Sequence, residues 1–238
     1  MSDSDWMVKP HGPAQTLAEN LWIVDAPLGN LDIHRRMVVA RGKAGGLLLH
    51  SAIALDDAGM TWLESLGGPQ VLVVPNGFHR LDAARYKERY PQLRVICPKA
   101  ARARVAQKVA VDGFYGDDLP FEGDESVQLT HLDGLHKREG VLRVESASGH
   151  SLIFNDALFN LPHIPGIFGF VYGRLMGNAG GPKVTTIARW VFVKNKKKYR
   201  AQLLSLAADP GLKRVIVAHG SLIEDEPGKV LMDVAATL

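Results

Sequence analysis

Residues 70–79 have the sequence QVLVVPNGFH, in which an apolar run ends in a proline-asparagine-glycine turn followed by a histidine. A continuous apolar run of this length is typical of a strand that is buried on both faces of a parallel sheet. Because the turn follows at once, a loop lies at the carboxyl end of the strand, where α/β sheets bind their ligands. The stretch therefore predicts an α/β protein with a candidate site at His79.

Strands and helices alternate along the first half of the chain. Short apolar runs bounded by turn residues predict strands, and apolar residues at helical spacing between Asp57 and Gly67 predict a helix. The expected strands are 21–28, 37–40, 45–50, 70–74 and 93–97. The expected helices are 58–66, 79–90 and one that begins at Ala100. This alternation is typical of α/β proteins.

The second half begins with a loop over 112–125 and continues with strands separated by glycine turns, which predicts antiparallel pairing. The expected strands are 127–132, 141–145, 151–155 and 214–218. Helices are expected over 196–208 and from Gly228, after an irregular Gly- and Pro-rich stretch over 162–182. No linker or repeat divides the chain, so we expect one domain over 1–238. Two strand-helix halves around an antiparallel middle predict a four-layer αββα sandwich, with two mixed sheets face to face and helices outside.

Composition restricts the class of protein. The chain has 238 residues, of which 46% are hydrophobic, within the size of one globular core. Cys97 is the only cysteine, which excludes an intrachain disulfide and a cysteine-rich zinc site. The N-terminal MSDSDWMVKP lacks the features of a secretory signal, and the most apolar window, 164–176, is too short and interrupted to span a bilayer. We therefore expect a cytoplasmic protein with no membrane partner.

The charge pattern does not predict nucleic-acid binding. The formal net charge is only +3, and the sequence pI near 9.0 reflects a modest excess of Lys and Arg. The dense basic run at 194–200 stands where a helix is expected to begin, and such runs usually face water. A nucleic-acid-binding protein needs a clustered basic patch, so no nucleic-acid partner is expected.

Polar residues with metal-binding side chains follow four of the expected strands. His79 follows 70–74, His136 lies in the turn after 127–132, Asp156 follows 151–155 and His219 follows 214–218. The members of this set are His79, His136, Asp156 and His219. Imidazole nitrogen and carboxylate oxygen together suit Zn²⁺, Fe²⁺ or Mn²⁺. The sequence therefore predicts one cleft at the strand ends in which these side chains meet.

The order of these motifs resembles the metallo-β-lactamase superfamily. The chain has a histidine loop after a strand, then LDGLH (132–136), IFNDALF (153–159) and VIVAHG (215–220). In that family a loop T-H-x-H-x-D-H, a histidine in a turn, a bridging aspartate after a strand and a final H-G carry the metals. The resemblance covers Asn20 to Leu238. It implies the αββα fold and a metal site at His79, His136, Asp156 and His219, with His131 as the competitor of His136.

The loop motif departs from the family pattern. If His79 is its last histidine, then Val74, Asn76 and Phe78 stand where the family has two histidines and an aspartate. The resemblance then implies an eroded site, in which the first metal keeps only His136. The second metal keeps His79, Asp156 and His219, a two-histidine, one-carboxylate set that can bind one ion. Phe78 could instead fill the vacated space and leave a dry, metal-free pocket.

Two functions follow from this pattern. The first is a hydrolase with one divalent metal, or an oxidoreductase, that acts on a small ester-, thioester- or lactone-like molecule, with His136 and Asp156 in catalysis. The second is a catalytically inactive, metal-free module on the same fold that binds a small molecule or a protein. The apolar window 164–176 is either core packing, a flap over the pocket or the contact of a homodimer.

Overall fold

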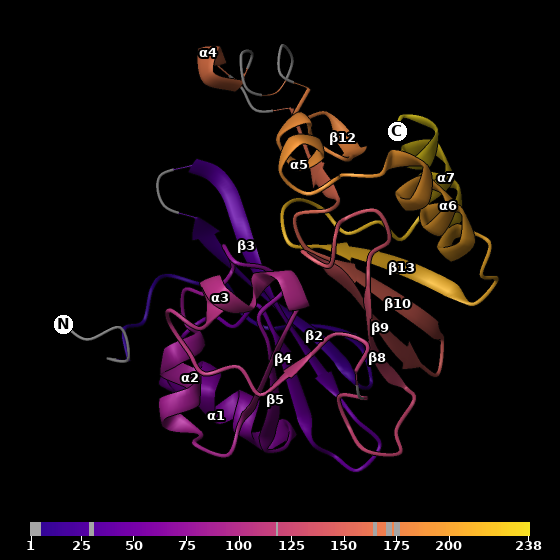
Figure 1. Cartoon of the computed structure of the whole chain (residues 1–238). Coiled ribbons are helices and arrows are strands. Elements are labelled where there is room, and N and C mark those ends of the chain that lie inside the picture. Colours follow the sequence, from indigo (N-terminus) through magenta and orange to yellow (C-terminus); the bar gives the residue numbers. More distant parts are fainter. Residues whose placement is uncertain (1–5, 29–30, 118, 164–165, 170–172, 174–176) are drawn as a thin grey trace.

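The computed structural model, which describes residues 6–28, 31–117, 119–163, 166–169, 173 and 177–238, contains two large β-sheets (Figure 1). The strands of the larger sheet are β1 (Gln15–Ala18), β2 (Leu21–Leu28), β3 (Leu31–Arg41), β4 (Leu47–His50), β5 (Pro69–Val73), β6 (Arg94–Cys97) and β7 (Gly113–Phe114). They pair in that order, antiparallel from β1 to β4 and parallel from β4 to β7. The larger sheet is therefore mixed.

The smaller sheet is mixed as well. Its strands are β8 (Val127–His131), β9 (Gly140–Ser146), β10 (Gly149–Phe154) and β13 (Leu212–Val217). They pair in the order β13-β10-β9-β8, and only the contact between β10 and β13 is parallel. A separate hairpin is formed by β11 (Phe159–Leu161) and β12 (Gly181–Lys183).

The two sheets pack face to face because their strands alternate apolar side chains between two cores. In β2, Leu21 and Ile23 lie in the core between the sheets, whereas Trp22 and Val24 lie in the outer core of the larger sheet. In β10, Ile153 lies between the sheets, and its neighbours lie in the outer core of the smaller sheet. Since successive side chains of a strand point to opposite faces, both faces of both sheets are buried.

Helices cover the two outer faces, as Figure 1 shows. On the larger sheet they are α1 (Asp57–Leu66), α2 (Ala83–Arg89), the 3₁₀ turn η1 (Lys99–Ala101) and α3 (Arg102–Val105). On the smaller sheet they are α5 (Thr186–Val191), α6 (Lys196–Ala207) and α7 (Pro227–Ala236). A short α4 (Gly166–Gly169) precedes α5. The predicted four-layer αββα sandwich is confirmed.

One predicted helix begins later than expected, and this changes the setting of His79. The sequence predicted a helix over 79–90, but α2 begins at Ala83. The side-chain oxygen of Asn76 accepts hydrogen bonds from the backbone N–H groups of Phe78 (2.8 Å) and His79 (3.2 Å). An asparagine that bonds to the backbone two residues on stabilises a turn rather than a helix. His79 therefore lies in a loop.

Two further expectations concern membranes and the apolar window. Among the described residues, no helix is both long enough and apolar enough to cross a bilayer. The window 164–176, for which core packing, a flap and a dimer contact were considered, lies largely outside the described residues. Its role remains a prediction from the sequence.

His50, at the end of β4, should make the stability depend on pH. Burial lowers the pKa of this imidazole from 6.5 to about 3, whereas in the unfolded chain it binds a proton below about pH 6.5. A depressed folded-state pKa gives stability that is present above the unfolded value and is lost as the pH falls toward the folded value. We expect His50 to lower the free energy of unfolding by about 2 kcal/mol between about pH 7.5 and pH 5.

Urea unfolding of the wild type and of His50→Leu at these two pH values checks this prediction. The wild type should lose about 2 kcal/mol more than the variant on acidification. The exposed His163 offers a matched control, because His163→Leu should keep the wild-type loss. Equal losses in the wild type and His50→Leu would contradict the prediction.

Candidate metal centre

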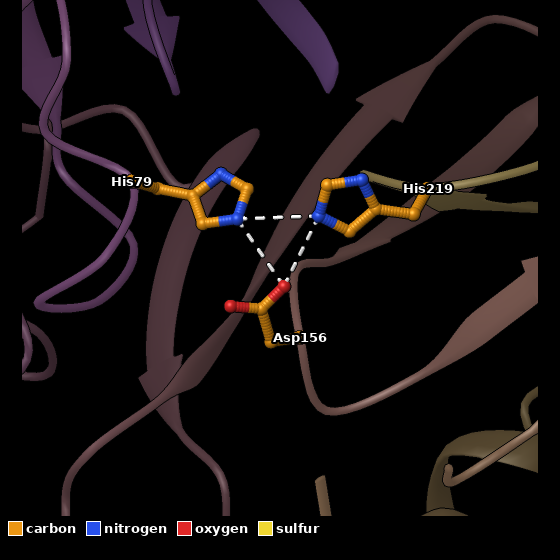
Figure 2. A group of neighbouring side chains, drawn as sticks. All are labelled: His79, Asp156 and His219. Atoms are coloured by element: carbon orange, nitrogen blue, oxygen red, sulfur yellow. Dashed lines mark hydrogen bonds and ion pairs between the residues drawn. The ribbon is translucent and has the colours of Figure 1, made fainter. Parts of the chain in front are cut away.

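Three side chains converge at one edge of the two sheets (Figure 2). The Nε2 atoms of His79 and His219 each lie 3.2 Å from Oδ1 of Asp156, and they lie 3.3 Å from each other. All three side chains are largely buried. This is the only group of at least three potential metal ligands of this kind among the described residues.

The fold brings these residues together from three strand ends. His79 follows β5 of the larger sheet, and Asp156 and His219 follow β10 and β13 of the smaller sheet. Because β10 and β13 are parallel neighbours, the residues after them meet at the same edge. The prediction that polar residues beyond the strand ends share one site therefore holds for His79, Asp156 and His219.

Hydrogen bonds fix the orientation of both imidazoles. His219 Nδ1 lies 2.6 Å from the carbonyl oxygen of His34; a carbonyl only accepts, so Nδ1 donates this hydrogen bond and Nε2 faces Asp156. His79 Nδ1 lies 3.1 Å from Ser51 Oγ, a residue held at a positive φ of 57°. The ring of Phe159 stacks on His219 at a centroid distance of 5.2 Å. Such partners orient the rings of metal-binding histidines.

Asp156 is held in place from its other side. Its Oδ2 accepts a hydrogen bond of 2.8 Å from Nδ2 of Asn76, which also donates to Oε1 of Glu139. Burial raises the pKa of the Asp156 carboxyl, but the facing imidazoles of His79 and His219 outweigh burial and bring this pKa below its usual value. Asp156 is therefore an anion at neutral pH, which a cation between these side chains requires.

Glu139 is a member of the site that the sequence analysis missed. It is fully buried, and its Oε1 accepts from Asn76 and from the backbone N–H of Asp156. Burial, and next the charge of Asp156, raise the pKa of Glu139 well above its usual value. Its position in the turn before Gly140, where β9 begins, gave no signal in the sequence, because charged residues at turns usually face water.

His136 does not join the cluster, which corrects the predicted four-residue site. It stands in a turn with a positive φ of 49°, and Lys137 follows with a φ of 57°. His136 is exposed, whereas Glu139 is buried. The competitor His131 is outside the cluster as well, because its Nε2 accepts from the backbone N–H of Lys99 at 3.2 Å. A ligand role for His136 has no support in the geometry.

The three departures from the family loop have separate roles in the structure. Val74 lies in the outer core of the larger sheet. Asn76 donates to both acidic residues of the site. Phe78 does not fill a vacated metal position, because its side chain is 53% exposed and its ring packs against Arg104 and Phe192.

The donor geometry fits a single divalent ion. In a tetrahedral zinc site with bonds of about 2.0–2.1 Å, two donor atoms lie about 3.3 Å apart. The three donor atoms of His79, Asp156 and His219 are 3.2–3.3 Å apart, so they match three corners of such a site. Two histidines and one carboxylate also form a donor set that binds Zn²⁺, Fe²⁺ or Mn²⁺.

Comparisons with known proteins agree with the architecture. No family model matches the sequence, and no curated protein does. Solved structures do match: a metallo-beta-lactamase from Pontibacter korlensis is 12% identical, with 95% of this chain and 99% of that chain covered and a TM-score of 0.62. The DIM-1 metallo-beta-lactamase is 13% identical (94% and 97% covered, TM-score 0.63), and VMB-1 is 10% identical (94% and 96%, 0.62).

These matches define the class of fold. The chain has the metallo-β-lactamase fold over most of its length, as the sequence predicted. At identities of 10–13% the likeness concerns the fold alone. The chemistry has to be inferred from the residues of this chain.

Proposed function

We propose that the protein is a hydrolase with one divalent metal per chain, acting on a small ester-, thioester- or lactone-like substrate. The observation that carries this proposal is the triangle of donor atoms on His79, Asp156 and His219, whose sides of 3.2–3.3 Å suit a tetrahedral ion. A divalent ion held there supplies Lewis-acid activation of a carbonyl group or a water molecule.

The residues of the chain have distinct tasks in this proposal. His79 and His219 bind through Nε2, while Ser51 and the carbonyl of His34 keep their rings oriented. Asp156 binds through Oδ1, and Asn76 occupies its other oxygen. Because Asn76 is an amide donor, it satisfies Oδ2 without a second cation. The site is thus built for one ion.

Metal analysis and an esterase assay test the proposal together. Protein incubated with excess Zn²⁺, Mn²⁺ or Fe²⁺ and then dialysed should contain about one ion per chain, in line with one set of ligands. A panel of short esters, thioesters and lactones should be hydrolysed by this protein. A chelator should abolish the activity, and the same ion should restore it.

The other outcomes are equally informative. Two tightly bound ions per chain would refute the assignment of the ligands. No bound ion after incubation with excess metal would overturn the hydrolase proposal and favour the metal-free binding module that the sequence also suggested. A bound ion without hydrolysis of any ester in the panel would remove the substrate class from the proposal and leave the metal site.

A further inference from the structure

A small cavity borders the metal centre at His79. Its volume is about 230 Å³, and its polar wall consists of Arg35, Ser51 and His79. The other described residues of the lining are apolar: Leu28, Ala52, Phe78 and Leu81. A cavity with an apolar body and a few converging polar groups is the usual form of a small-molecule site.

Among the described residues of this lining, Arg35 is the only cationic side chain, and it is 7% exposed. Its Nη2 donates to Oδ2 of Asp82 at 2.6 Å, and its Nη1 makes only a long contact of 3.5 Å to the carbonyl of Ala52. The guanidinium is therefore anchored mainly through Nη2. Its remaining N–H groups form no closer hydrogen bond with the residues that the structure describes.

Asp82 does not fully compensate the charge of Arg35. The carboxylate is 1% exposed, and its other oxygen accepts from Nη1 of Arg85. The carboxylate of Asp82 is thus shared by Arg35 and Arg85. A partly compensated cation in a cavity wall of low dielectric constant attracts an anion more strongly than an exposed arginine does.

We propose that Arg35 binds a carboxylate group of the substrate, so that the substrate is a short ester or lactone whose acyl chain carries an anionic end. This inference rests on the proposed hydrolase function, since it places the reacting carbonyl at His79 and the carboxylate at Arg35. Guanidinium groups bind carboxylates by parallel hydrogen bonds of fixed geometry. The acyl chain between the two ends lies along Ala52, Phe78 and Leu81.

The size of the cavity limits the length of the acyl chain. Its volume of about 230 Å³ is below the roughly 300–1,000 Å³ of sites for drug-sized ligands. A dicarboxylic monoester with a few methylene groups fits this volume. Long acyl chains do not fit.

Two esters that differ by one charge test the inference. Monomethyl glutarate and dimethyl glutarate share the acyl chain and the leaving group, and in both a water molecule cleaves the acyl C–O bond to give the acid and methanol. The zinc-loaded wild type should hydrolyse the monoester with a kcat/KM about 10- to 100-fold higher, the usual effect of hydrogen bonds to a charged group. The preference should lie mainly in KM.

Variants of two arginines locate the source of the preference. Arg35→Gln should abolish the preference for the monoester, and Arg35→Lys should retain part of it. Arg104 offers a matched control, because it lies against Phe78 but lines a different cavity. Arg104→Gln should keep the wild-type preference. A preference that survives Arg35→Gln, or that disappears in Arg104→Gln, would overturn the inference.

The experiment separates this inference from the proposed function. If both esters are hydrolysed equally by the metal-loaded wild type, the hydrolase proposal stands and the carboxylate site is refuted. If neither ester is hydrolysed, calorimetric titration with monomethyl glutarate decides. Binding by the wild type that weakens about tenfold or more in Arg35→Gln supports the carboxylate site, and equal or absent binding refutes it. Should Arg35→Gln fail to fold, the comparison is made with Arg35→Lys.

Discussion

Asp156→Asn is expected to lower the affinity for the metal more than about a hundredfold. The loss should be larger than that caused by removing a residue that only hydrogen-bonds to a metal ligand. Asp156 is the only carboxylate among the three donors, and its Oδ1 lies 3.2 Å from both imidazole nitrogens. Asparagine keeps the shape of the side chain but removes the negative charge that a divalent ion needs. Competition with a chelator of known zinc affinity measures the change.

His136→Ala is the matched control for this prediction. His136 is exposed and outside the group of three donors, so its removal should leave the affinity within about twofold, as for a residue without contact to a ligand or its partners. If His136→Ala lowered the affinity as much as Asp156→Asn, the assignment of the three ligands would be wrong. If neither variant changed it, the ion would bind elsewhere.

Arg36→Met is expected to reduce the free energy of unfolding by about 3 kcal/mol, the lower end for breaking a buried ion pair. The Arg36 guanidinium forms two hydrogen bonds with Asp25 of β2, of 2.7 and 2.8 Å. From β3 it also reaches across to the other sheet, where Nη1 donates to the carbonyls of Val217 and Gly220. We expect a loss of stability at the lower end of the range for buried ion pairs because Asp25 is partly exposed.

Urea unfolding of Arg36→Met and of Arg41→Met checks this expectation. Arg41 is on the same strand, but it donates one hydrogen bond to the backbone of Glu19 and packs over the ring of Trp22. Its replacement should cost less than about 1 kcal/mol, as is usual for surface positions. Equal losses in the two variants would show that the contacts of Arg36 with the second sheet add nothing to stability.

The layers could be predicted from the sequence because they depend on short-range patterns. The apolar runs 70–74 and 21–28 predicted strands; β2 forms over 21–28 and β5 is shifted by one residue relative to 70–74. The short strands β1, β7, β11 and β12 were missed, since two to four residues carry no recognisable period. Their pairing is decided by neighbours that are distant in the sequence.

The site was predictable in part for the same reason. Asp156 and His219 stand two residues after β10 and β13, and His79 lies in the loop that leaves β5, so the ends of these strands bring the three residues together. His136 also stands near a strand end, but it is exposed and has a positive φ of 49°. The residue types in this turn do not predict that conformation. Glu139 was overlooked because charged residues at turns usually face water, and only the tertiary structure shows its burial.

The positions of Val74 and Asn76 have a consequence for protein engineering. A designer who wished to install a second ion beside the first would begin by restoring histidines at these two places. Val74 is packed in the apolar core behind the larger sheet, where an imidazole would lack hydrogen-bond partners and would destabilise the fold. Replacing Asn76 would remove the hydrogen bonds that its side chain donates to Asp156 and Glu139. No single replacement creates the second position, so a two-metal version of this scaffold requires redesign of the helix-covered core as well as of the loop.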